Sequence, residues 1–283
     1  MDASIPPGRA RPLGQAPASA LAAVHGILTD IDDTLTSDGH LDPAARVALD
    51  DLRAHGIPVL AVTGRPMGWS QPFAQPGPQA WPVAAIVAEN GAVALRRDRG
   101  RVVVEYAQDG VTRERNAVRL EQVAARILRE VPGAQLARDS AGRVTDIAVD
   151  HGEFARLDAA QIEAVVALMR REGMNASVSS IHVNGWFGTH DKWSGACWMV
   201  GRLFGRELAA ESSRWIYVGD STNDQVMFRR FELSVGVANL LRFAGELVDW
   251  PTYLTVGERG VGFAEVARAV LAARAPSRRQ GVT

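Results

Sequence analysis

Five short segments of almost unbroken apolar residues constrain this fold more than any other feature of the sequence. They read VHGILTD at 24–30, IPVLAVTG at 57–64, VAAIVAEN at 83–90, RWIYVGD at 214–220 and LSVGVAN at 233–239. Strands that are apolar throughout and that alternate with helical patterns are typical of a parallel sheet covered on both faces. The pattern predicts an α/β protein with a Rossmann-like parallel-sheet core.

The segment LDPAARVALDDLRAHG at 41–56 illustrates the helices between these strands. Asp42 suits an N-cap, Pro43 the first helical position and Gly56 the C-terminal stop. Ala45, Ala48, Leu49 and Leu52 share one face of this predicted helix.

The middle of the chain has a different pattern. After the strand-like RVVVEYA at 101–107, a long helix is predicted over 112–131 and a pair of strands around the turn 140–142. A second helix over 157–172 and two more strands, MNASVSS and IHVNGWF, complete the order β, α, ββ, α, ββ. We predict an inserted α+β unit at residues 98–186, a core at 23–97 and 187–274, and disordered tails at 1–22 and 275–283.

Composition excludes several classes of partner. The formal net charge is −1, so the overall charge of the chain does not attract nucleic acid or an anionic membrane. Cys197 is the single cysteine, which rules out an internal disulfide, and no apolar run approaches the roughly 20 residues of a membrane span. The N-terminus lacks the apolar core of a secretory signal. We expect a cytoplasmic monomer or homodimer.

Polar residues follow the apolar strands, where ligands bind in open α/β sheets. Taken singly, each suits a helix cap, a turn or a solvated charge. Together they form a set that a single site explains: Asp30, Asp32 and Thr34; Thr63, Gly64 and Arg65; Glu89, Asn90 and Gly91; Asp220, Ser221, Asn223 and Asp224; and Lys192 at a helix start.

A divalent cation accounts for the acidic members of this set. Mg²⁺ takes oxygen ligands and would neutralise Asp30, Asp220 and Asp224, which otherwise repel one another. Thr63 and Lys192 then offer a hydroxyl donor and a positive charge to the oxygens of a phosphate group. The residues therefore predict a magnesium and phosphate site.

The same residues resemble the four motifs of the haloacid dehalogenase superfamily of phosphatases, over about residues 24–274. DIDDTLT matches D-x-D-x-T, VTGR the second motif, Lys192 the third and GDSTND the fourth. An insertion between the second and third motifs resembles the type IIB cap, as in Cof-type phosphatases and sucrose-phosphate phosphatase. ENGA and GERGVGFAEVARAVL are also similar to that group.

The resemblance implies a role for each motif residue. Asp30 is expected to attack phosphorus and form an aspartyl-phosphate, and Asp32 to act as general acid and then base. Thr63 and Lys192 would hold the phosphoryl group. The implied Mg²⁺ ligands are Asp30, the backbone carbonyl of Asp32, Asp220, and Asp224 directly or through water. Thr34 would support the loop, and Asp33, where many members have glycine, is given no role.

The substrate is less constrained than the reaction. Arg65 and Asn90 follow strands at the catalytic edge and, with Asn223, are the predicted substrate-binding residues. His182, Asn184 and Trp186 are further candidates from the cap. The inserted unit has no basic patch for a polyanion, so a small phosphorylated metabolite such as a sugar phosphate is expected.

Three alternatives stay open. A phosphomutase uses the same D-x-D-x-T chemistry but returns the phosphate to the sugar. A receiver-type phospho-acceptor domain also gathers acidic residues, a threonine and a lysine, although on a shorter chain and from different strands. The third alternative is a relative that binds a metal without catalysis.

Overall fold

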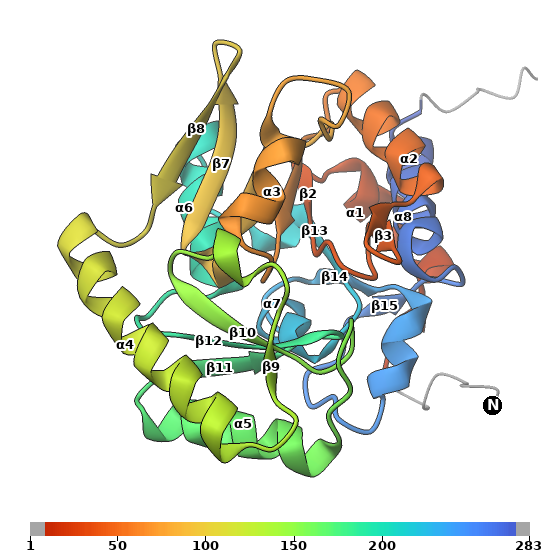
Figure 1. Ribbon diagram of the computed structural model, residues 1–283. Helices are drawn as coiled ribbons and strands as arrows, with labels where there is room; N and C mark the ends of the chain where they lie inside the picture. The colour runs from red at the N-terminus through yellow and green to blue at the C-terminus, as the bar shows by residue number, and fades with distance from the viewer. Residues whose placement is uncertain (1–8, 276–283) are drawn as a thin grey trace, which may run out of the picture.

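A nine-stranded sheet forms the centre of the protein in a computed structural model that describes residues 9–275. Its strand order is β1-β15-β14-β13-β2-β5-β6-β7-β8, parallel from β1 through β6 and antiparallel for β7 and β8 (Figure 1). In that order the bounds are Arg11–Pro12, Tyr253–Leu254, Leu233–Gly236, Trp215–Gly219, Gly26–Thr29, Val59–Val62, Ala85–Ala88, Val93–Asp98 and Arg101–Tyr106. The predicted α/β class and parallel core are confirmed.

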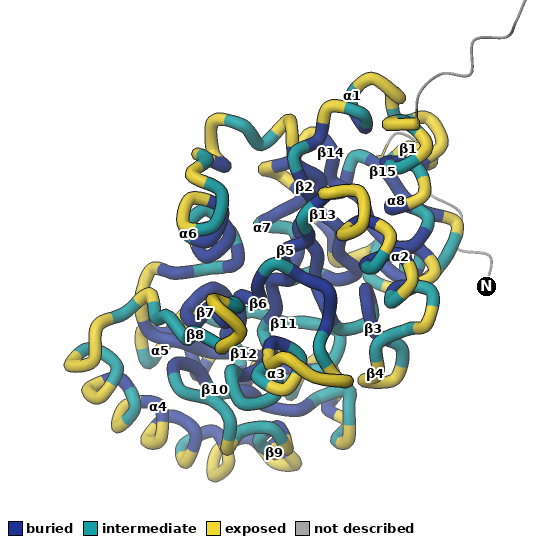
Figure 2. The backbone as a smooth tube through the Cα atoms, turned by 90° about the horizontal axis from the view of Figure 1, so that it is seen from above, coloured by how far each residue is buried: buried dark blue, intermediate teal, exposed yellow. Residues whose placement is uncertain are grey.

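Helices cover both faces of this sheet. Figure 2 shows α6 on one side and α2 with α8 on the other, with the strands between them. The first face carries α6 (Lys192–Phe204) and α7 (Gln225–Phe228). The second face carries α1 (Ala18–Ala22), α2 (Pro43–Ala54), α3 (Met67–Ala74) and α8 (Arg259–Arg274). Two hydrophobic cores therefore flank the sheet, which is why its central parallel strands β2, β5 and β6 are buried throughout.

Short 3₁₀ turns and one small hairpin complete the core. The turns are Leu13–Gln15, Glu89–Gly91, Ser212–Arg214, Thr222–Asp224 and Ala238–Phe243, with a further one at Ser140–Gly142. The hairpin pairs β3 (Thr36–Ser37) with β4 (His40–Leu41) directly after the acidic loop.

The predicted helix over 43–54 forms as expected. The Asp42 carboxylate accepts the Ala44 amide at 2.8 Å, Pro43 is the first helical residue, and Gly56 has a positive φ of 70°. All four residues of its predicted apolar face, Ala45, Ala48, Leu49 and Leu52, are buried.

A second, antiparallel sheet lies beside the first. Its strand order is β11-β12-β10-β9, with bounds Asn175–Val178, His182–Trp186, Asp146–Asp150 and Gln135–Leu136. Helices α4 (Gly110–Glu130) and α5 (Ala159–Arg171) cover its outer side (Figure 1) and pack on Val149 and Val183. Because successive strand residues face opposite sides, His182, Asn184 and Asp146 lie on the face toward the large sheet.

Two details differ from the prediction. Residues 101–106 pair with β7 in the large sheet instead of joining the inserted unit, because β7 offers an antiparallel partner across the turn at 99–100. Residues 9–22 are ordered: β1 pairs with β15, and Leu13 and Leu21 are buried in the core. The rest of the predicted domain division stays a prediction, and the tails at 1–8 and 276–283 lie outside the described residues.

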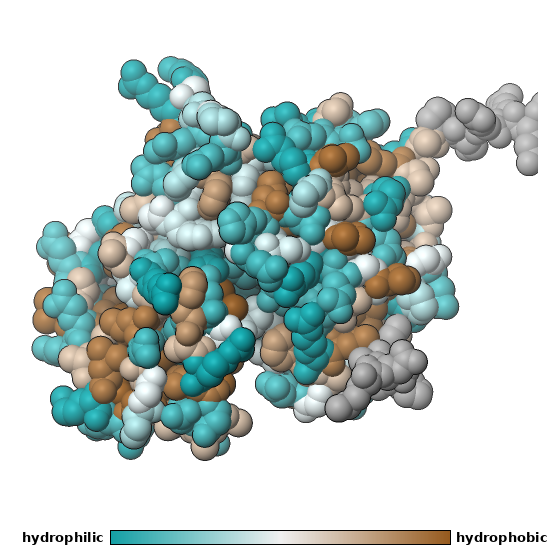
Figure 3. Space-filling view, turned by 45° about the vertical axis from the view of Figure 1, so that its right-hand side comes forward, coloured by the Kyte–Doolittle hydropathy of each residue, from teal (hydrophilic) through white to brown (hydrophobic). Residues whose placement is uncertain are grey.

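The surface shows no single dominant apolar region in the view of Figure 3. Hydrophobic side chains there form separate groups among hydrophilic ones, and a notch in the lower edge separates two lobes. Within residues 9–275, no helix is both long and apolar enough to cross a membrane.

Candidate active site

The carboxyl ends of neighbouring strands bring the predicted motif residues together. β2 lies between β13 and β5, and these three strands lead to Asp30, Asp220 and Thr63. The Asp30 amide donates to the Val218 carbonyl at 2.8 Å, which fixes the first acidic residue beside the end of β13. The site therefore lies at the edge of the sheet that faces the four-stranded sheet.

Three buried carboxylates converge at this edge. Ligand atoms of Asp30, Asp220 and Asp224 all lie within 4.8 Å of one another. Lys192 reaches them from the first turn of α6, and its Nζ donates to Asp30 Oδ1 and Asp224 Oδ1, each at 2.7 Å. The same ammonium group donates to Asn223 Oδ1 at 3.1 Å. Residues far apart in the sequence thus share one cluster of charge.

Burial dominates the electrostatics of the cluster. It raises the pKa of Asp30 to about 8, with Lys192 acting in the opposite direction and Asp224 adding to the increase. Burial and then the charge of Asp30 raise the pKa of Asp220 well above its ordinary value. Burial opposes the charge of Lys192, yet Asp224 and Asp30 raise the pKa of its ammonium group above the usual range. One ammonium group does not balance three carboxylates in a buried site.

The donor set fits a divalent cation such as Mg²⁺. It consists of carboxylate oxygens, the ligand type that Mg²⁺ prefers. With all three carboxylates ionised and Lys192 protonated, two negative charges lack a partner within the cluster, and a divalent cation supplies that charge. Asp220 is held in place for such a role, since Thr34 Oγ1 contacts its Oδ1 at 3.4 Å and Asn239 Nδ2 donates to its Oδ2 at 3.2 Å.

Asp224 has a second role. Its Oδ2 accepts the amides of Asp220 and Ser221 at 2.9 and 3.1 Å. Its Oδ1 accepts the Tyr217 hydroxyl at 2.5 Å in addition to Lys192. Because four donors already surround this carboxylate, Asp224 positions the loop and the lysine, and contact with a cation through water suits it better than direct ligation.

A small cavity beside the cluster contains most of the predicted catalytic groups. It has a volume of about 10 Å³ and is lined from the core by Asp30, Asp32, Thr63 and Asn223. The second sheet contributes His182, Asn184 and the loop 179–181. Thr63 Oγ1 accepts the Arg65 amide at 3.0 Å, so its hydroxyl proton is available to a ligand. Such a volume holds about one water molecule, so the described conformation is closed.

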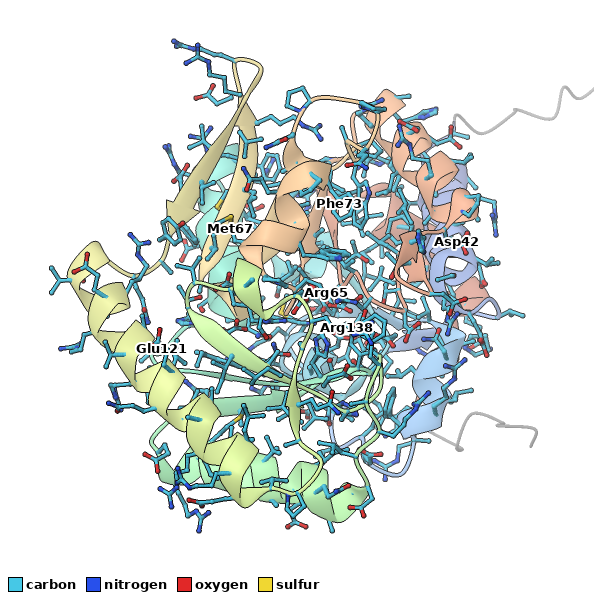
Figure 4. The ribbon with its side chains drawn as sticks, viewed as in Figure 1. Asp42, Arg65, Met67, Phe73, Glu121 and Arg138 are labelled. Carbon is cyan, nitrogen blue, oxygen red and sulfur yellow. The ribbon has the colours of Figure 1, made fainter. Side chains whose placement is uncertain are left out.

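Arg65 connects the two parts of the protein. Figure 4 shows it at the junction between the large sheet and the four-stranded sheet. Its guanidinium group bonds Asp32 at 2.9–3.0 Å, Glu153 at 2.8 Å and Asp139 at 3.2 Å. Arg65 was predicted to bind substrate, but in this conformation the hydrogen-bond partners of its guanidinium group are carboxylates of the protein. The group also packs over Trp69, with Cζ 5.0 Å from the ring centroid.

Asn90 also differs in its surroundings from the prediction. It is buried, and its amide donates to Asp146 Oδ2 at 3.3 Å, as does Asn184. Asn90 does not line the small cavity. Trp186 does not line that cavity either, and it stacks on His190 with ring centroids 5.8 Å apart.

Sequence reasoning missed three groups that support the site. Tyr217 is the one hydroxyl-bearing side chain in β13 and holds Asp224. Asn239 follows β14 and donates to both the Asp33 carbonyl and Asp220. Its position directly after an apolar strand could have identified it as a site residue. Glu153 belongs to an irregular segment of the second unit, where no pattern pointed to it.

Comparison with known proteins agrees with this arrangement. Residues 27–115 match the profile of the haloacid dehalogenase-like hydrolases, a stretch that contains the first two motifs. This part of the chain therefore resembles the haloacid dehalogenase-like hydrolases. No curated protein matches this chain significantly.

Solved structures share this fold at low sequence identity. The sucrose-phosphatase of Synechocystis sp. PCC6803, in complex with sucrose and phosphate, is 16% identical, with a TM-score of 0.62 over 87% of this chain and 98% of that one. A putative HAD/COF-like hydrolase from Plasmodium vivax is 16% identical, with a TM-score of 0.63 over 90% and 98%. A trehalose-6-phosphate phosphatase related protein is 16% identical, with a TM-score of 0.54 over 88% and 96%.

Proposed function

We propose that the protein is a Mg²⁺-dependent phosphatase that hydrolyses a phosphomonoester through an aspartyl-phosphate. One observation carries the proposal: Asp30 lies within a cluster of three buried carboxylates and one buried lysine, beside Thr63 and Asp32. Phosphoryl transfer needs a positioned nucleophile and compensation of the charge on the phosphoryl oxygens. These residues offer both.

Each of these residues has its own role in the proposed reaction. An Asp30 carboxylate oxygen forms a bond to phosphorus, the ester P–O bond breaks, and Asp32 gives its proton to the leaving oxygen. Lys192 and the Thr63 hydroxyl hold the phosphoryl oxygens. Asp32 then takes a proton from water, which attacks phosphorus and releases inorganic phosphate and Asp30.

A bound Mg²⁺ would be held by Asp30, the Asp32 carbonyl and Asp220, with Asp224 beside them. Its chemistry is to compensate negative charge between the phosphate and the attacking carboxylate, whose repulsion is otherwise about 4 kcal/mol at an effective dielectric constant of about 20.

Asp32 must exchange partners to act as an acid. In the closed conformation it accepts three contacts from Arg65 at 2.9–3.0 Å. Acid catalysis therefore requires the leaving-group oxygen to replace part of this ion pair. Arg65 keeps Asp139 and Glu153 as partners during that exchange, so it stays in place when Asp32 turns to the substrate.

A sugar phosphate is the proposed substrate class. A second cavity of about 460 Å³ begins at Asp32 and runs between the core and the second unit. Charged and polar side chains line it, among them Asp33, Glu153, Ser180 and Arg259. Arginines and carboxylates are present in equal numbers along its wall, which suits a neutral, hydroxyl-rich leaving group. The sucrose-phosphatase and the trehalose-6-phosphate phosphatase related protein among the structural neighbours support the same class.

Phosphate release tests the proposal. The full chain is incubated with a panel of phosphorylated sugars, nucleotides and a phosphopeptide, with Mg²⁺ or with EDTA, and free phosphate is measured. We expect release from at least one sugar phosphate with Mg²⁺ only, and a loss of at least about 100-fold in Asp30→Asn and in Asp32→Asn.

Other results would assign another function. Conversion of one sugar phosphate to its isomer without net phosphate release would identify a phosphomutase. A stable aspartyl-phosphate with no turnover would identify a phospho-acceptor. Release from nucleotides alone would contradict the sugar-phosphate class and leave the phosphatase reaction intact.

A further inference from the structure

A larger cavity lies outside the candidate active site. Its volume is about 530 Å³, within the roughly 300–1,000 Å³ of typical small-molecule sites. Three glycines and one alanine form part of its wall. The other lining residues are Tyr106, Gln108, Thr189, His190, Ser194 and Trp198.

This cavity lies where the chain passes between the two sheets. Residues 107–109 lead from β8 to α4, and residues 187–191 return from β12 to α6; both connections line it. The Gln108 side chain ties them together, because its Nε2 donates to the Phe187 carbonyl at 2.7 Å. A ligand here would contact both connections, 107–109 and 187–191, which are the hinges of the second unit.

The lining favours an uncharged ligand. Among the residues that line it, none carries a formal charge apart from a potential charge on His190, and burial lowers the pKa of that imidazole to about 4. An anion or a cation would find no counter-charge among the residues that line the cavity. The lining therefore favours an uncharged sugar over a phosphorylated one.

Hydrogen-bonding groups are nevertheless present. His190 is 8% exposed, and within the described part of the chain its Nε2 has no hydrogen-bond partner. The hydroxyls of Thr189 and Tyr106, the Gln108 amide and the imidazole can each donate or accept, as sugar hydroxyls do. Trp198 and Tyr106 add aromatic surface for the apolar side of a sugar ring.

We propose that this hinge cavity binds a neutral sugar and that its occupancy regulates movement of the second unit. The idea that this sugar is the dephosphorylated product rests on the proposed function; the site for an uncharged sugar does not. Ser194 and Gly195 lie in the cavity wall within three residues of Lys192, so a ligand there also contacts the helix that delivers the lysine.

Binding to the full chain tests this proposal directly. Glucose, mannose, sucrose and trehalose are titrated separately into the wild type by calorimetry. At least one is expected to bind. Thr189→Arg should reduce that affinity at least about tenfold, because it places a large cation in a cavity without carboxylates. Thr189 is exposed, so the variant should fold.

Two further variants make the result specific. Val111→Arg adds the same charge at a site 77% exposed on α4, outside the cavity, and should bind as the wild type does. His190→Phe keeps a ring against Trp186 but removes the unpartnered nitrogen, and should bind about 2–10-fold more weakly. Thr189→Arg should also abolish any effect of the sugar on phosphate release.

Failure of this proposal differs from failure of the phosphatase assignment. If none of the four sugars binds, or if Thr189→Arg binds as tightly as the wild type, the hinge site is wrong even when phosphate is released. If the sugar binds in a Thr189-dependent manner to a protein that releases no phosphate, the hinge site stands and the phosphatase assignment fails.

Discussion

Lys192 is the only lysine among the 31 lysines and arginines of this sequence. Elsewhere the chain uses arginine for every cation, including the buried Arg65 and Arg143. A compact ammonium group can donate to three oxygens around one point, as it does to Asp30, Asp224 and Asn223. A planar guanidinium group cannot reproduce that geometry in the same space.

Lys192→Arg therefore tests the geometry and not only the charge. We expect phosphate release to fall at least about 100-fold in Lys192→Arg and in the neutral Lys192→Met. Arg115→Met, on the exposed side of α4, is the matched control for loss of a cation and should keep wild-type activity. Activity of Lys192→Arg within threefold of the wild type would contradict the proposed role.

The burial of His190 leads to a prediction about the stability of the protein in acid. Burial lowers the pKa of its imidazole from 6.5 to about 4, so the unfolded chain binds this proton more readily than the folded protein. The contribution of neutral His190 to the free energy of unfolding is fully present above pH 6.5. It decreases as the pH falls toward 4, by up to about 3 kcal/mol.

His190→Phe should remove this dependence. Urea unfolding of the wild type and the variant at several pH values between 4 and 7.5 measures it. The difference in unfolding free energy between the two should change steadily across the range from 6.5 to 4. A difference that is constant with pH would show that His190 is not held in its neutral form.

Single residues of the site were predictable to different degrees. Asp30, Thr63 and Lys192 could be located because they follow apolar strands or begin a helix, and parallel strands bring such positions to one edge. The contacts that Arg65 makes could not be predicted in this way. Its partners Asp139 and Glu153 come from the second sheet unit, and nothing in the local sequence encodes how that unit closes over the first.

At the scale of elements, the turn after β6 joins the two sheets. The Glu89 carboxylate accepts the amides of Met67 at 3.0 Å, Val144 at 3.1 Å and Thr145 at 2.6 Å, and the Thr145 hydroxyl at 2.5 Å. Met67 begins α3, whereas Val144 and Thr145 lead into β10. One buried side chain therefore holds a core helix and a strand of the second unit.

Glu89→Gln should loosen this junction. An amide in place of the carboxylate turns an NH₂ group toward backbone donors, which costs about 1–3 kcal/mol for the unsatisfied groups. Urea unfolding should show the loss, and hydrogen exchange should accelerate at residues 144 and 145. Glu114→Gln, an exposed change on α4, is the control. Equal protection of these amides in both variants would contradict the role of Glu89.

Elements with a regular pattern were predicted well, and those defined by distant partners were not. The helix at 43–54 carries its own cap and apolar face, and both are confirmed. β8 has partly exposed residues and alternates too weakly to indicate which sheet it joins. Its place in the large sheet follows from pairing with β7, a contact that the local pattern leaves open.

At the scale of the whole molecule, the N-terminal segment 9–22 closes one edge of the core. The Arg11 amide donates to the Thr252 carbonyl at 3.0 Å, and Leu13 and Leu21 are 3% and 6% exposed. The proline- and alanine-rich composition around these leucines suggested disorder, but two buried leucines and the free edge of β15 give the segment a place to pack.

Truncation measures the contribution of this segment. A chain that begins at Ala23 should lose about 1.5–3 kcal/mol for each of the two leucines, while a chain that begins at Arg9 retains every described contact and is the control. Chemical denaturation compares the two. If they unfold at the same denaturant concentration, the packing of residues 9–22 does not stabilise the protein.

The cavity of about 10 Å³ at Asp30 has a consequence for turnover. A chamber the size of one water molecule cannot admit a phosphate ester, so under the proposed function we expect the second unit to move away and return in each catalytic cycle. Contacts between the two units, including Thr222 with Val178 and Arg65 with Glu153, would then break and re-form each time. The turnover rate of this protein would then be limited by the frequency with which the second unit opens, however fast the bond to phosphorus forms.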